Sequence, residues 1–513
     1  MAIYRNYSRD QVQMKTMCIN DYIEKDHHAK IIVNIISKMD LKSFDKAFNN
    51  DMGGKPAYPV NNLLALLIYS YLDGVYSSRK IERYCREHLA YKYLCCDDPP
   101  DHVTITRFYS RFHEQIRHVF AQTIYIGIQE GLITFETLSF DGVKISAMSS
   151  KSRVINIENS DMLLKSIENQ IDNLMYLINK TNDIDLSEKL VKKINKKNAE
   201  KQRIIDGLEK LKSKKLEIAE KKKTMEVENV NNLCLTEHDS PLMKQSMKYY
   251  DTCYNGVAAA DGKCKMSVTA ILTSNCTDRY NGMISLKDSI KMVGINNIRQ
   301  ALSFFDAGFW NNTFIEYGYK NNLDLYIAYK SMKKMYCKTM NAYKKQKMNY
   351  LADKDVFECA QGCHLTLRGH YSNSKGSTHA LYIKTGCSKC PLNNECITTK
   401  DKTRKRIKVN VSKSLTTNND TLDPKNSMIA KMDTEEAKEK YKKRFYTIEP
   451  VFGEMKNNRK FTRFSVWGIK KAETQWILVN IVHNFSKIIR YANRNSLLNK
   501  QKLTYTDDLC YKY

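Results

Sequence analysis

Apolar positions follow a helical spacing at the start of the chain and a strand-like spacing in its middle. Residues 1 to about 130 contain apolar stretches between polar faces, as in residues 60–69, which predicts an all-helical N-terminal region. From Thr137, apolar and polar residues alternate over 137–147, with Asp141-Gly142 expected to allow a bulge or turn. The pattern predicts further strands at 248–261, 265–273, 301–305 and 323–329, with a short helix at 290–298. This order predicts an α/β core that insertions interrupt.

A long amphipathic segment forms the first of these insertions. Its apolar residues step by three and four, stop at Thr181-Asn182-Asp183, and then resume the same spacing. The residues concerned are Leu164, Ile167, Ile171, Leu174 and Ile178, then Leu190, Ile194, Ile204, Leu208, Leu211 and Ile218. This spacing predicts an antiparallel, coiled-coil-like helical hairpin whose second helix is capped at Ser187.

Residues 331–433 form a second insertion, which is rich in Lys and Cys. Cys387-Ser388-Lys389-Cys390 is a CxxC knuckle, and Cys359 with Cys396 completes a set of four candidate thiolate ligands for a structural Zn²⁺ ion. Cys363, His364 and His379 are alternative ligands. The other interpretation is a group of reduced structural thiols without metal.

The patterns together predict a chain of several parts. The chain has 513 residues, whereas domains with a single hydrophobic core rarely exceed roughly 250 to 300 residues. The predicted parts are a helical N-terminal domain at 1–130, the first part of the core at 131–159, the hairpin at 160–228, the second part of the core at 229–330, the Lys- and Cys-rich insertion at 331–433, the C-terminal helices of the core at 434–495 and a tail at 496–513.

The charge balance points to a polyanionic partner. The chain carries 83 basic and 56 acidic residues, a formal net charge of +27, together with 32 Tyr that can stack on bases. Nucleic acid is the usual partner of such a surface, although charge alone does not separate a catalyst from a binder. Because no apolar run approaches the roughly 20 residues of a membrane span and no signal sequence is recognisable, we expect a cytosolic protein without membrane contact, with its 15 Cys reduced or bound to metal.

Two basic segments of the N-terminal region are candidate DNA contacts. The first, 77–86, contains Arg79, and the second, 101–112, contains Arg107 and Arg111. The second segment follows Pro99-Pro100 and has the character of a recognition helix in a helix-turn-helix. A packing helix with a solvated basic face is the alternative.

Three acids are candidate ligands for catalytic metal ions. Asp141 lies on the first predicted strand, Asp306 ends a central strand, and Glu449 stands within the basic stretch 441–463. Because Pro450 is tolerated in the first turn of a helix, Glu449 is expected at a helix start or a kink. Three carboxylates on an α/β core can hold two Mg²⁺ ions for phosphodiester chemistry. The alternatives are a turn residue at Asp141 and a surface charge ladder at Glu449.

The ordered motifs around these acids resemble those of bacterial insertion-sequence transposases of the DDE class. They are FDGVK at 140–144, DSPLMK at 239–244, YNGVAAAD at 254–261, FDAGFW at 305–310 and TIEPVFGEMKNNR at 447–459. The basic block 77–112 is similar to the helical domain that precedes the catalytic core in that family. The resemblance spans about residues 50 to 490.

This resemblance implies an RNase H-like core with Asp141, Asp306 and Glu449 as catalytic, metal-binding residues. It implies Mg²⁺ or Mn²⁺ as cofactor, strand cleavage at the terminal inverted repeats of an element, and transfer of the 3′ ends into target DNA. A homodimer or higher synaptic complex in the bacterial cytoplasm, associated with the nucleoid, also follows from it. Tyr441, Arg444 and Lys456 match residues that accompany the family's catalytic glutamate, Arg444 standing one residue further from it, and Arg459 is expected on the same DNA-binding surface.

Two alternatives stay open at this point. The first is an inactive or domesticated relative that binds DNA without cutting it. The second is a nuclease of the same core fold that cuts DNA without joining a 3′-hydroxyl to a second duplex. Glu454 is the rival acid to Glu449, but on a regular helix it lies about 140° away, given about 100° per residue.

Overall fold

The computed structural model describes residues 18–46, 57–181, 183–221, 231–245, 249–329, 349–351, 356–359, 361–372, 378–397, 403–410 and 424–495. The predicted tail, 496–513, lies outside them. The chain divides into two compact units, one made of 1–327 with 430–513 and the other of 328–429. Within the described ranges, every helix is too short or too polar to cross a lipid bilayer.

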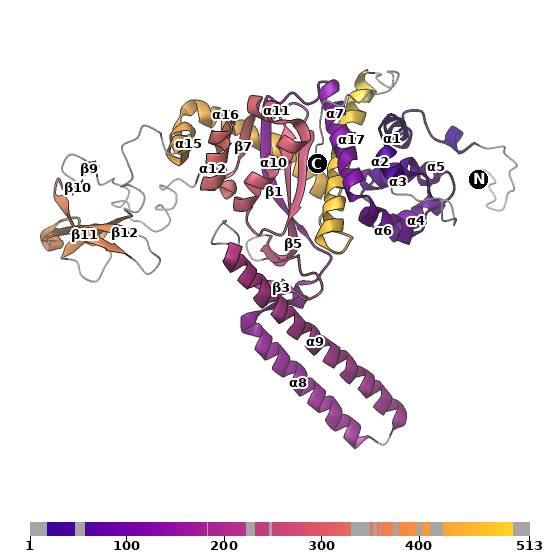
Figure 1. Cartoon of the computed structure of the whole chain (residues 1–513), viewed down its shortest axis with the longest axis horizontal. Coiled ribbons are helices and arrows are strands. Elements are labelled where there is room, and N and C mark those ends of the chain that lie inside the picture. The colour runs from indigo at the N-terminus through magenta and orange to yellow at the C-terminus, as the bar shows by residue number, and fades with distance from the viewer. Residues whose placement is uncertain are drawn as a thin grey trace, which may run out of the picture. The chain divides into compact units, whose positions relative to one another are not determined.

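The N-terminal region of the first unit is helical, as Figure 1 shows in indigo and purple. Helix α3 is buried nearly all round because Leu63 to Ile68 are all apolar and enclosed. Tyr71 on α3 and Tyr109 on α6 share a buried hydrogen bond of 2.8 Å between their hydroxyl groups. The helices are α1 His28–Ser37, α2 Lys42–Asp45, α3 Val60–Leu72, α4 Ser78–Glu87, α5 Leu89–Leu94, α6 His102–Arg111 and α7 His113–Gln129.

A six-stranded mixed sheet forms the centre of this unit. Its strands are β1 Thr137–Ser146, β4 Leu242–Lys244, β5 Tyr250–Asp261, β6 Ser267–Thr273, β7 Leu302–Phe305 and β8 Leu325–Ile327. The order is β4-β5-β1-β7-β8, with β6 also paired to β5; β4, β5 and β6 form antiparallel pairs, whereas β1, β7 and β8 run parallel. The predicted α/β class with a mixed-sheet core is therefore confirmed.

The expected bulge or turn at Asp141-Gly142 is wrong. Strand β1 pairs with β5 in unbroken register from Leu138 opposite Asp261 to Ser146 opposite Cys253. The glycine is accommodated in a regular strand because antiparallel hydrogen bonds need only backbone groups.

Helices cover both faces of the sheet. On one face Gly282, at the start of α10, lies against Phe309 and Phe314, and Phe305 stacks on Phe140 with ring centroids 4.3 Å apart. On the other face Trp476 of α17 packs against Gly256 of β5. The helices that follow β6 in the chain are α10 Asn281–Val293, α11 Ile295–Gln300, α12 Asn312–Lys320, α15 Pro424–Asp433, α16 Glu435–Gly453 and α17 Ile469–Asn495, and the segment Glu454–Asn458 between the last two is a π-helix.

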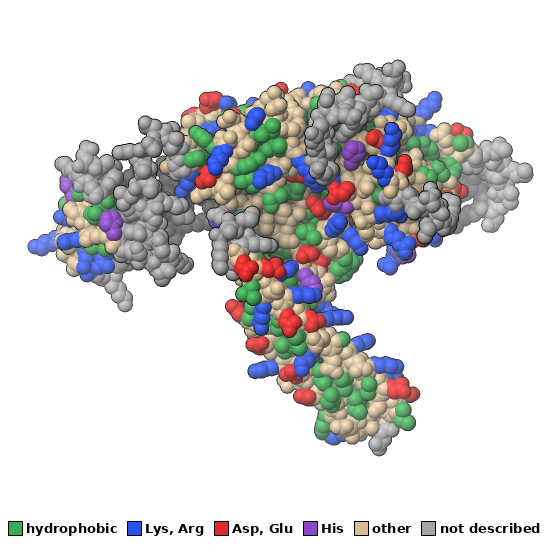
Figure 2. All heavy atoms as spheres, viewed as in Figure 1, with side chains coloured by type: hydrophobic (Ala, Val, Ile, Leu, Met, Phe, Trp, Pro, Cys, Tyr) green, Lys and Arg blue, Asp and Glu red, His purple; other side chains and the backbone are tan. Residues whose placement is uncertain are grey.

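Helices α8 (Ile157–Lys180) and α9 (Ile184–Lys221) lie side by side as a hairpin, and the short strands β2 (Val154–Asn156) and β3 (Asn232–Cys234) pair at its base. Its buried seam contains Ile167, Ile171, Ile194 and Ile204. The expected cap at Ser187 is wrong, because α9 starts earlier and the Asp183 carboxylate accepts from the amides of Asp185 and Leu186 at 2.9 and 3.2 Å. Figure 2 shows Lys and Arg interleaved with Asp and Glu along the hairpin.

The second unit contains an antiparallel sheet of order β13-β12-β11-β10-β9. Leu365 and Tyr382 form its small core, with Phe357, Cys359 and Ile407 packed against them. The elements are β9 Asn349–Leu351, β10 Val356–Glu358, β11 His364–Ser372, β12 Thr378–Thr385, the 3₁₀ turn Cys387–Lys389, α14 Asn393–Cys396 and β13 Arg404–Asn410.

Candidate catalytic site

Asp141 and Asp306 lie at the same level of two neighbouring parallel strands. Phe140 of β1 is the register partner of Phe305 of β7, and each aspartate follows its phenylalanine directly. Strand β7 ends at Phe305, so Asp306 stands at the carboxyl edge of the sheet, where open α/β sheets place their sites. The two acids predicted from the sequence are therefore brought together by strand pairing.

Burial raises the pKa of Asp141 to about 6. Arg444 opposes this shift, because its guanidinium Nη2 lies 2.9 Å from Asp141 Oδ2. The negative charges of Asp306 and Asp278 raise the pKa further, while the amide of Gly142 donates to Asp141 Oδ1 at 2.9 Å and lowers it. Asp141 thus lies among negative charges, which the guanidinium of Arg444 offsets directly.

Asp306 is held by the turn that it begins. Its Oδ1 accepts the amide of Gly308 at 2.7 Å and so caps the 3₁₀ turn Ala307–Phe309. Tyr441 of α16 donates its hydroxyl to the carbonyl oxygen of Phe305 at 3.0 Å. This bond fixes the strand end next to Asp306, so the tyrosine positions protein backbone.

Glu449 lies on the exposed surface of α16, five residues after Arg444. The expected helix start at this glutamate is wrong. Helix α16 begins at Glu435, capped by the Thr434 hydroxyl, and runs through Pro450. Pro450 removes a hydrogen bond to the carbonyl of Tyr446. Both residues are exposed, so water can satisfy that carbonyl, which explains why the helix continues.

Lys456 lies in the π-helical segment, and Arg459 is the residue directly after that segment. Lys456 Nζ donates to the carbonyl oxygen of Lys144 on β1 at 2.9 Å, which places the ammonium group three residues along the strand from Asp141. Arg459 is 7% exposed and pairs with Glu454 at 2.9 Å. The predicted DNA contact by Arg459 is therefore wrong, because its guanidinium is buried in the packing of the C-terminal helices.

Glu454, the rival acid, belongs to the same buried network. Besides Arg459 its carboxylate faces His483 at 3.3 Å, Lys487 at 3.6 Å and Arg490 at 3.7 Å. Burial alone would raise the pKa of Glu454, but the contact with His483 and the nearby cations hold it well below its usual range. This carboxylate is neutralised within the protein, in contrast to the exposed Glu449.

Asp278 is a neighbouring acid that the sequence did not single out. It begins the 3₁₀ turn Asp278–Tyr280 between β6 and α10, and its Oδ1 accepts the side-chain amide of Asn255 at 2.7 Å. Burial and the charge of Asp306 raise the pKa of Asp278, whereas Asn255 and Lys144 lower it. The only hint in the sequence was indirect: glycines stand at positions 142 and 308, and the side chain of Asp278 lies beside both of them.

These oxygens fit a divalent cation. Carboxylates and an amide carbonyl are the hard ligands that Mg²⁺ and Mn²⁺ prefer, and their mutual repulsion would be relieved by positive charge. Asn255 Oδ1 is buried and has no hydrogen-bond partner among the residues that the structure describes. Among the described residues, no three His, Cys, Asp or Glu side chains already stand close enough to enclose a metal ion. A bound cation would therefore neutralise the negative charge of these carboxylates, which Arg444 now neutralises only in part.

The predicted zinc ligands of the second unit lie in one neighbourhood. Burial raises the pKa of Cys387, and Cys396, Cys390 and Cys359 raise it further through their charges. The amide of Cys390 donates to the carbonyl of Cys387 at 3.1 Å, closing the knuckle. The four thiols do not meet the spacing of a formed metal site in the described part of this unit. The side chain of His379 lies outside the described residues.

In the N-terminal helices, Arg79 on α4 and Arg107 and Arg111 on α6 are exposed. Helix α6 starts where Asp101 accepts the amide of Thr104 at 2.6 Å, and it buries Ile105, Phe108 and Tyr109. The side chain of His102 contacts Glu82 of α4 at 2.7 Å. Helix α6 therefore presents its arginines on the face opposite its packing surface, and α4 is fixed beside it.

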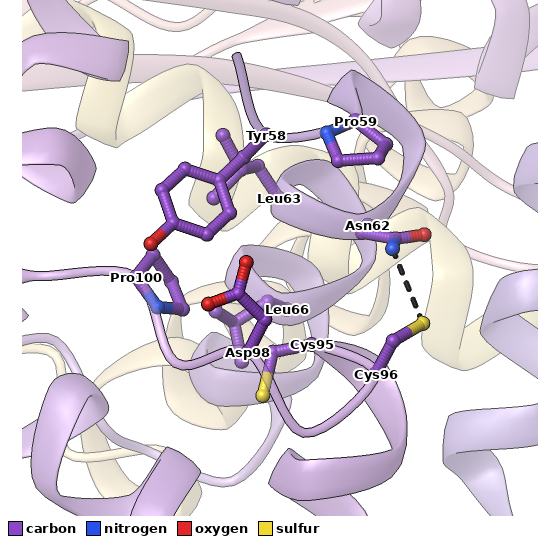
Figure 3. Close-up of a pocket in the computed structure, with 9 residues that line it drawn as sticks. All are labelled: Tyr58, Pro59, Asn62, Leu63, Leu66, Cys95, Cys96, Asp98 and Pro100. Atoms are coloured by element: carbon purple, nitrogen blue, oxygen red, sulfur yellow. Dashed lines mark hydrogen bonds between the residues drawn. The ribbon is translucent and has the colours of Figure 1, made fainter. Parts of the chain in front are cut away.

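A cavity of about 300 Å³ adjoins the turn that leads into α6 (Figure 3). Tyr58 and Asp98 face it, and Asn62 donates to the sulfur of Cys96 at 3.4 Å. Cys96 and Asp97 have positive φ values of 54° and 58°, so the turn is a tight one. Its other lining residues are Pro59, Leu63, Leu66, Cys95 and Pro100. The cavity contains no pair of groups suited to catalysis and is best described as a gap beside this turn.

A mixed sheet with aspartates on or directly after two neighbouring parallel strands, and Arg444 of α16 beside one of them, is the arrangement expected of an RNase H-like core. Comparison with family models agrees with this expectation. Residues 358–489 match the transposase DDE domain, and residues 17–111 match a transposase domain of the DUF772 family. The two matches support the resemblance of this chain to insertion-sequence transposases of the DDE class. The first match contains Glu449 but neither aspartate. A search of curated proteins found no match.

Proposed function

We propose that this chain is a metal-dependent DNA transposase that acts in the cytoplasm, cleaves the ends of an insertion sequence and joins them to target DNA. The observation that carries the proposal is the pairing of Asp141 and Asp306 on β1 and β7, with Arg444 of α16 at Asp141. Transposase domains at both ends of the chain support DNA as the substrate.

The proposed reaction has two phosphoryl-transfer steps. In the first, water attacks a phosphodiester at the element's terminal inverted repeat, the P–O3′ bond breaks, and the 3′ oxygen leaves with a proton as a hydroxyl group. In the second, that 3′-hydroxyl attacks a phosphodiester of target DNA, a new P–O3′ bond forms, and a target 3′-hydroxyl is released. Both steps need in-line positioning and neutralisation of negative charge.

Asp141, Asp306 and Glu449 would hold two divalent cations, Mg²⁺ or Mn²⁺, in this proposal. Bound there, the cations supply acidification of the attacking hydroxyl and neutralisation of charge on the leaving oxygen. Arg444 and Lys456 flank the site along α16 and β1 and would bind DNA phosphates. Tyr441 keeps the end of β7 in place through its bond to Phe305.

The N-terminal helices would recognise the terminal repeat. Val103, Arg107 and Arg111 are exposed along α6, and Arg79 is exposed on the neighbouring α4. A helix in the major groove reads bases with such side chains, while a basic helix beside it contacts the backbone. Because both ends of an element must be brought together, we further propose that the working form is a homodimer or a higher synaptic complex.

The test is cleavage of a labelled terminal-repeat duplex in Mg²⁺ or Mn²⁺, with binding followed by gel shift. Asp141→Asn, Asp306→Asn and Glu449→Gln should each lose cleavage and keep DNA binding. Glu439→Gln, an exposed change on α16, and Asp324→Asn, just before β8, serve as controls that should keep both. A wild-type protein that binds the duplex and never cuts it would overturn the enzyme proposal in favour of a DNA-binding relative.

A further inference from the structure

The loop after β6 brings a third aspartate, Asp278, beside Gly142 within β1 and Gly308 beyond the end of β7. Successive residues of a strand face opposite sides of its sheet, so Asp141 faces Arg444 and α16 while Gly142 faces the side of α10. A Cβ atom built on Gly142 would lie 2.3 Å from Asp278 Oδ1. The carboxylate of Asp278 therefore occupies the place where any side chain at position 142 would stand.

A second glycine, Gly308, lies next to Asp278 beyond the end of β7. A Cβ atom on Gly308 would lie 2.9 Å from Asp306 Oδ1 and 3.6 Å from both Cβ and Oδ2 of Asp278. Neither Gly142 nor Gly308 is among the glycines with positive φ. At Gly142 the close neighbour is Asp278, whereas at Gly308 the close neighbour is Asp306 and Asp278 lies at ordinary contact distance.

Asn255 provides a separate indication of a ligand at this place. It is completely buried, and its Nδ2 donates to Asp278 Oδ1 at 2.7 Å and to the carbonyl of Asn275 at 3.3 Å. Within the described part of the chain its Oδ1 accepts no hydrogen bond, and this atom lies 2.9 Å from the Cβ position of Gly142. A buried acceptor without a donor is uncommon, and here it faces the same gap as a carboxylate. Such a pair of oxygens suits a cation.

Building on the proposed function, we propose that Asp278 is a further carboxylate ligand of the divalent cation site, with Asn255 as its positioning residue. It would reach the cation from the α10 side of the sheet, whereas Glu449 belongs to α16 on the other side. The position of Asp278 is set by its hydrogen bond to Asn255 of β5 and by the 3₁₀ turn before α10. Three aspartates would thus contribute from three different segments of the chain.

The first test measures Mn²⁺ binding to the full-length chain at pH 8 by electron paramagnetic resonance, without DNA. Asp278→Asn keeps the size of the side chain and an oxygen that can accept from Asn255. We expect the dissociation constant for Mn²⁺ to rise about tenfold or more, as when groups around a metal site are removed. Asp239→Asn, whose side chain is 50% exposed, is the matched control and should bind Mn²⁺ like the wild type.

A second test uses the space beside Gly142. Gly142→Ala should displace Asp278 and weaken Mn²⁺ binding in the wild-type background, but add little to the loss in an Asp278→Ala background. Fully additive losses would contradict the assignment, because residues that act through one contact are not additive. The assignment of Asp278 is also contradicted if Asp278→Asn binds Mn²⁺ and cuts DNA like the wild type while Asp141→Asn loses both activities. In that case the proposed function still holds. If the wild type neither binds Mn²⁺ nor cuts DNA, the proposed function itself fails.

Discussion

Arg444 Nη2 lies 2.9 Å from Asp141 Oδ2, and both side chains are largely buried, with 13% and 20% exposed. The guanidinium therefore binds an oxygen of Asp141 that a catalytic metal ion would need as a ligand. Two cations cannot share that oxygen without mutual repulsion. We infer that Arg444 turns towards a DNA phosphate when the metal site fills.

Arg444→Gln should accordingly strengthen Mn²⁺ binding and weaken catalysis. At pH 8 and without DNA, we expect the dissociation constant for Mn²⁺ to fall several-fold, because competition for Asp141 is removed. Cleavage of the terminal-repeat duplex should fall at the same time, since a phosphate contact is lost. Lys443→Gln, an equal change of charge at an exposed position on the same helix, should do neither. Weaker Mn²⁺ binding in the Arg444 variant would show that the arginine organises the site instead of competing for it.

The raised pKa of Asp141 predicts how stability depends on pH in metal-free protein. Its pKa is about 6 when folded against 3.8 for the unperturbed group, so the folded state favours the protonated acid. That contribution is fully present below pH 3.8 and is lost as pH rises through about 6. Asp141→Asn should therefore be more stable than the wild type at pH 8, by about 1 to 3 kcal/mol, and the difference should shrink towards pH 4.

Thermal unfolding in EDTA at pH 4.5 and pH 8 measures this difference. Added Mn²⁺ should then stabilise the wild type at pH 8 and leave the variant nearly unchanged, because a ligand of the folded state shifts unfolding by mass action. A variant that is less stable than the wild type at pH 8 would mean that Arg444 compensates the buried charge completely.

The sequence predicted the parts of this site that depend on periodicity. Asp141 and Asp306 were found because a strand pattern surrounds one and precedes the other, and parallel strands bring their carboxyl ends to one edge. Asp278 follows a strand but shows no pattern of its own. Its place depends on a loop that crosses back towards β1 and on a space left by Gly142, which are properties of tertiary packing.

Helix boundaries and charge partners were predicted less well, for physical reasons. Pro450 was expected at a helix start or a kink; the helix start is wrong, because an exposed proline can be accommodated within α16. Arg459 was grouped with its basic neighbours, yet the π-helical turn Glu454–Asn458 carries it inward to Glu454. A run of positive charge in a sequence does not show which of its members finds a buried partner.

Glu449 and Glu454 should respond oppositely to replacement by Gln. Glu449 is exposed, so Glu449→Gln should unfold like the wild type and lose cleavage. Glu454 is 11% exposed among Arg459, His483, Lys487 and Arg490. Removing its charge leaves buried cations unpaired, which we expect to cost about 3 kcal/mol of folding free energy. Denaturant unfolding and cleavage per folded molecule separate the two effects. Loss of cleavage in a fully folded Glu454→Gln variant would mean that Glu454 takes part in catalysis, against the assignment to Glu449.

The grouping of thiols around Cys387 predicts bound zinc in the purified chain. If Cys359, Cys387, Cys390 and Cys396 are its ligands, native mass spectrometry should detect one zinc ion per chain, and Cys387→Ser should lose it. Cys264→Ser, outside the second unit, is the control and should retain the metal. A wild-type chain with no zinc and four readily alkylated thiols would show that these are reduced structural cysteines.

Arg107 separates base recognition from general attraction to DNA. It is exposed on α6 opposite Ile105 and Phe108, the side chains that anchor this helix. If α6 enters the major groove, Arg107→Ala should cost about 1 to 3 kcal/mol on the terminal repeat and much less on a scrambled duplex of equal length. Arg83→Ala, an exposed arginine of α4 paired with Glu87 at 3.5 Å, removes the same charge as a control. It should weaken binding to both duplexes equally and slightly, with a shallower dependence on salt. An equal loss on both duplexes for Arg107→Ala would mean that α6 contacts the DNA backbone, and that another element reads the repeat.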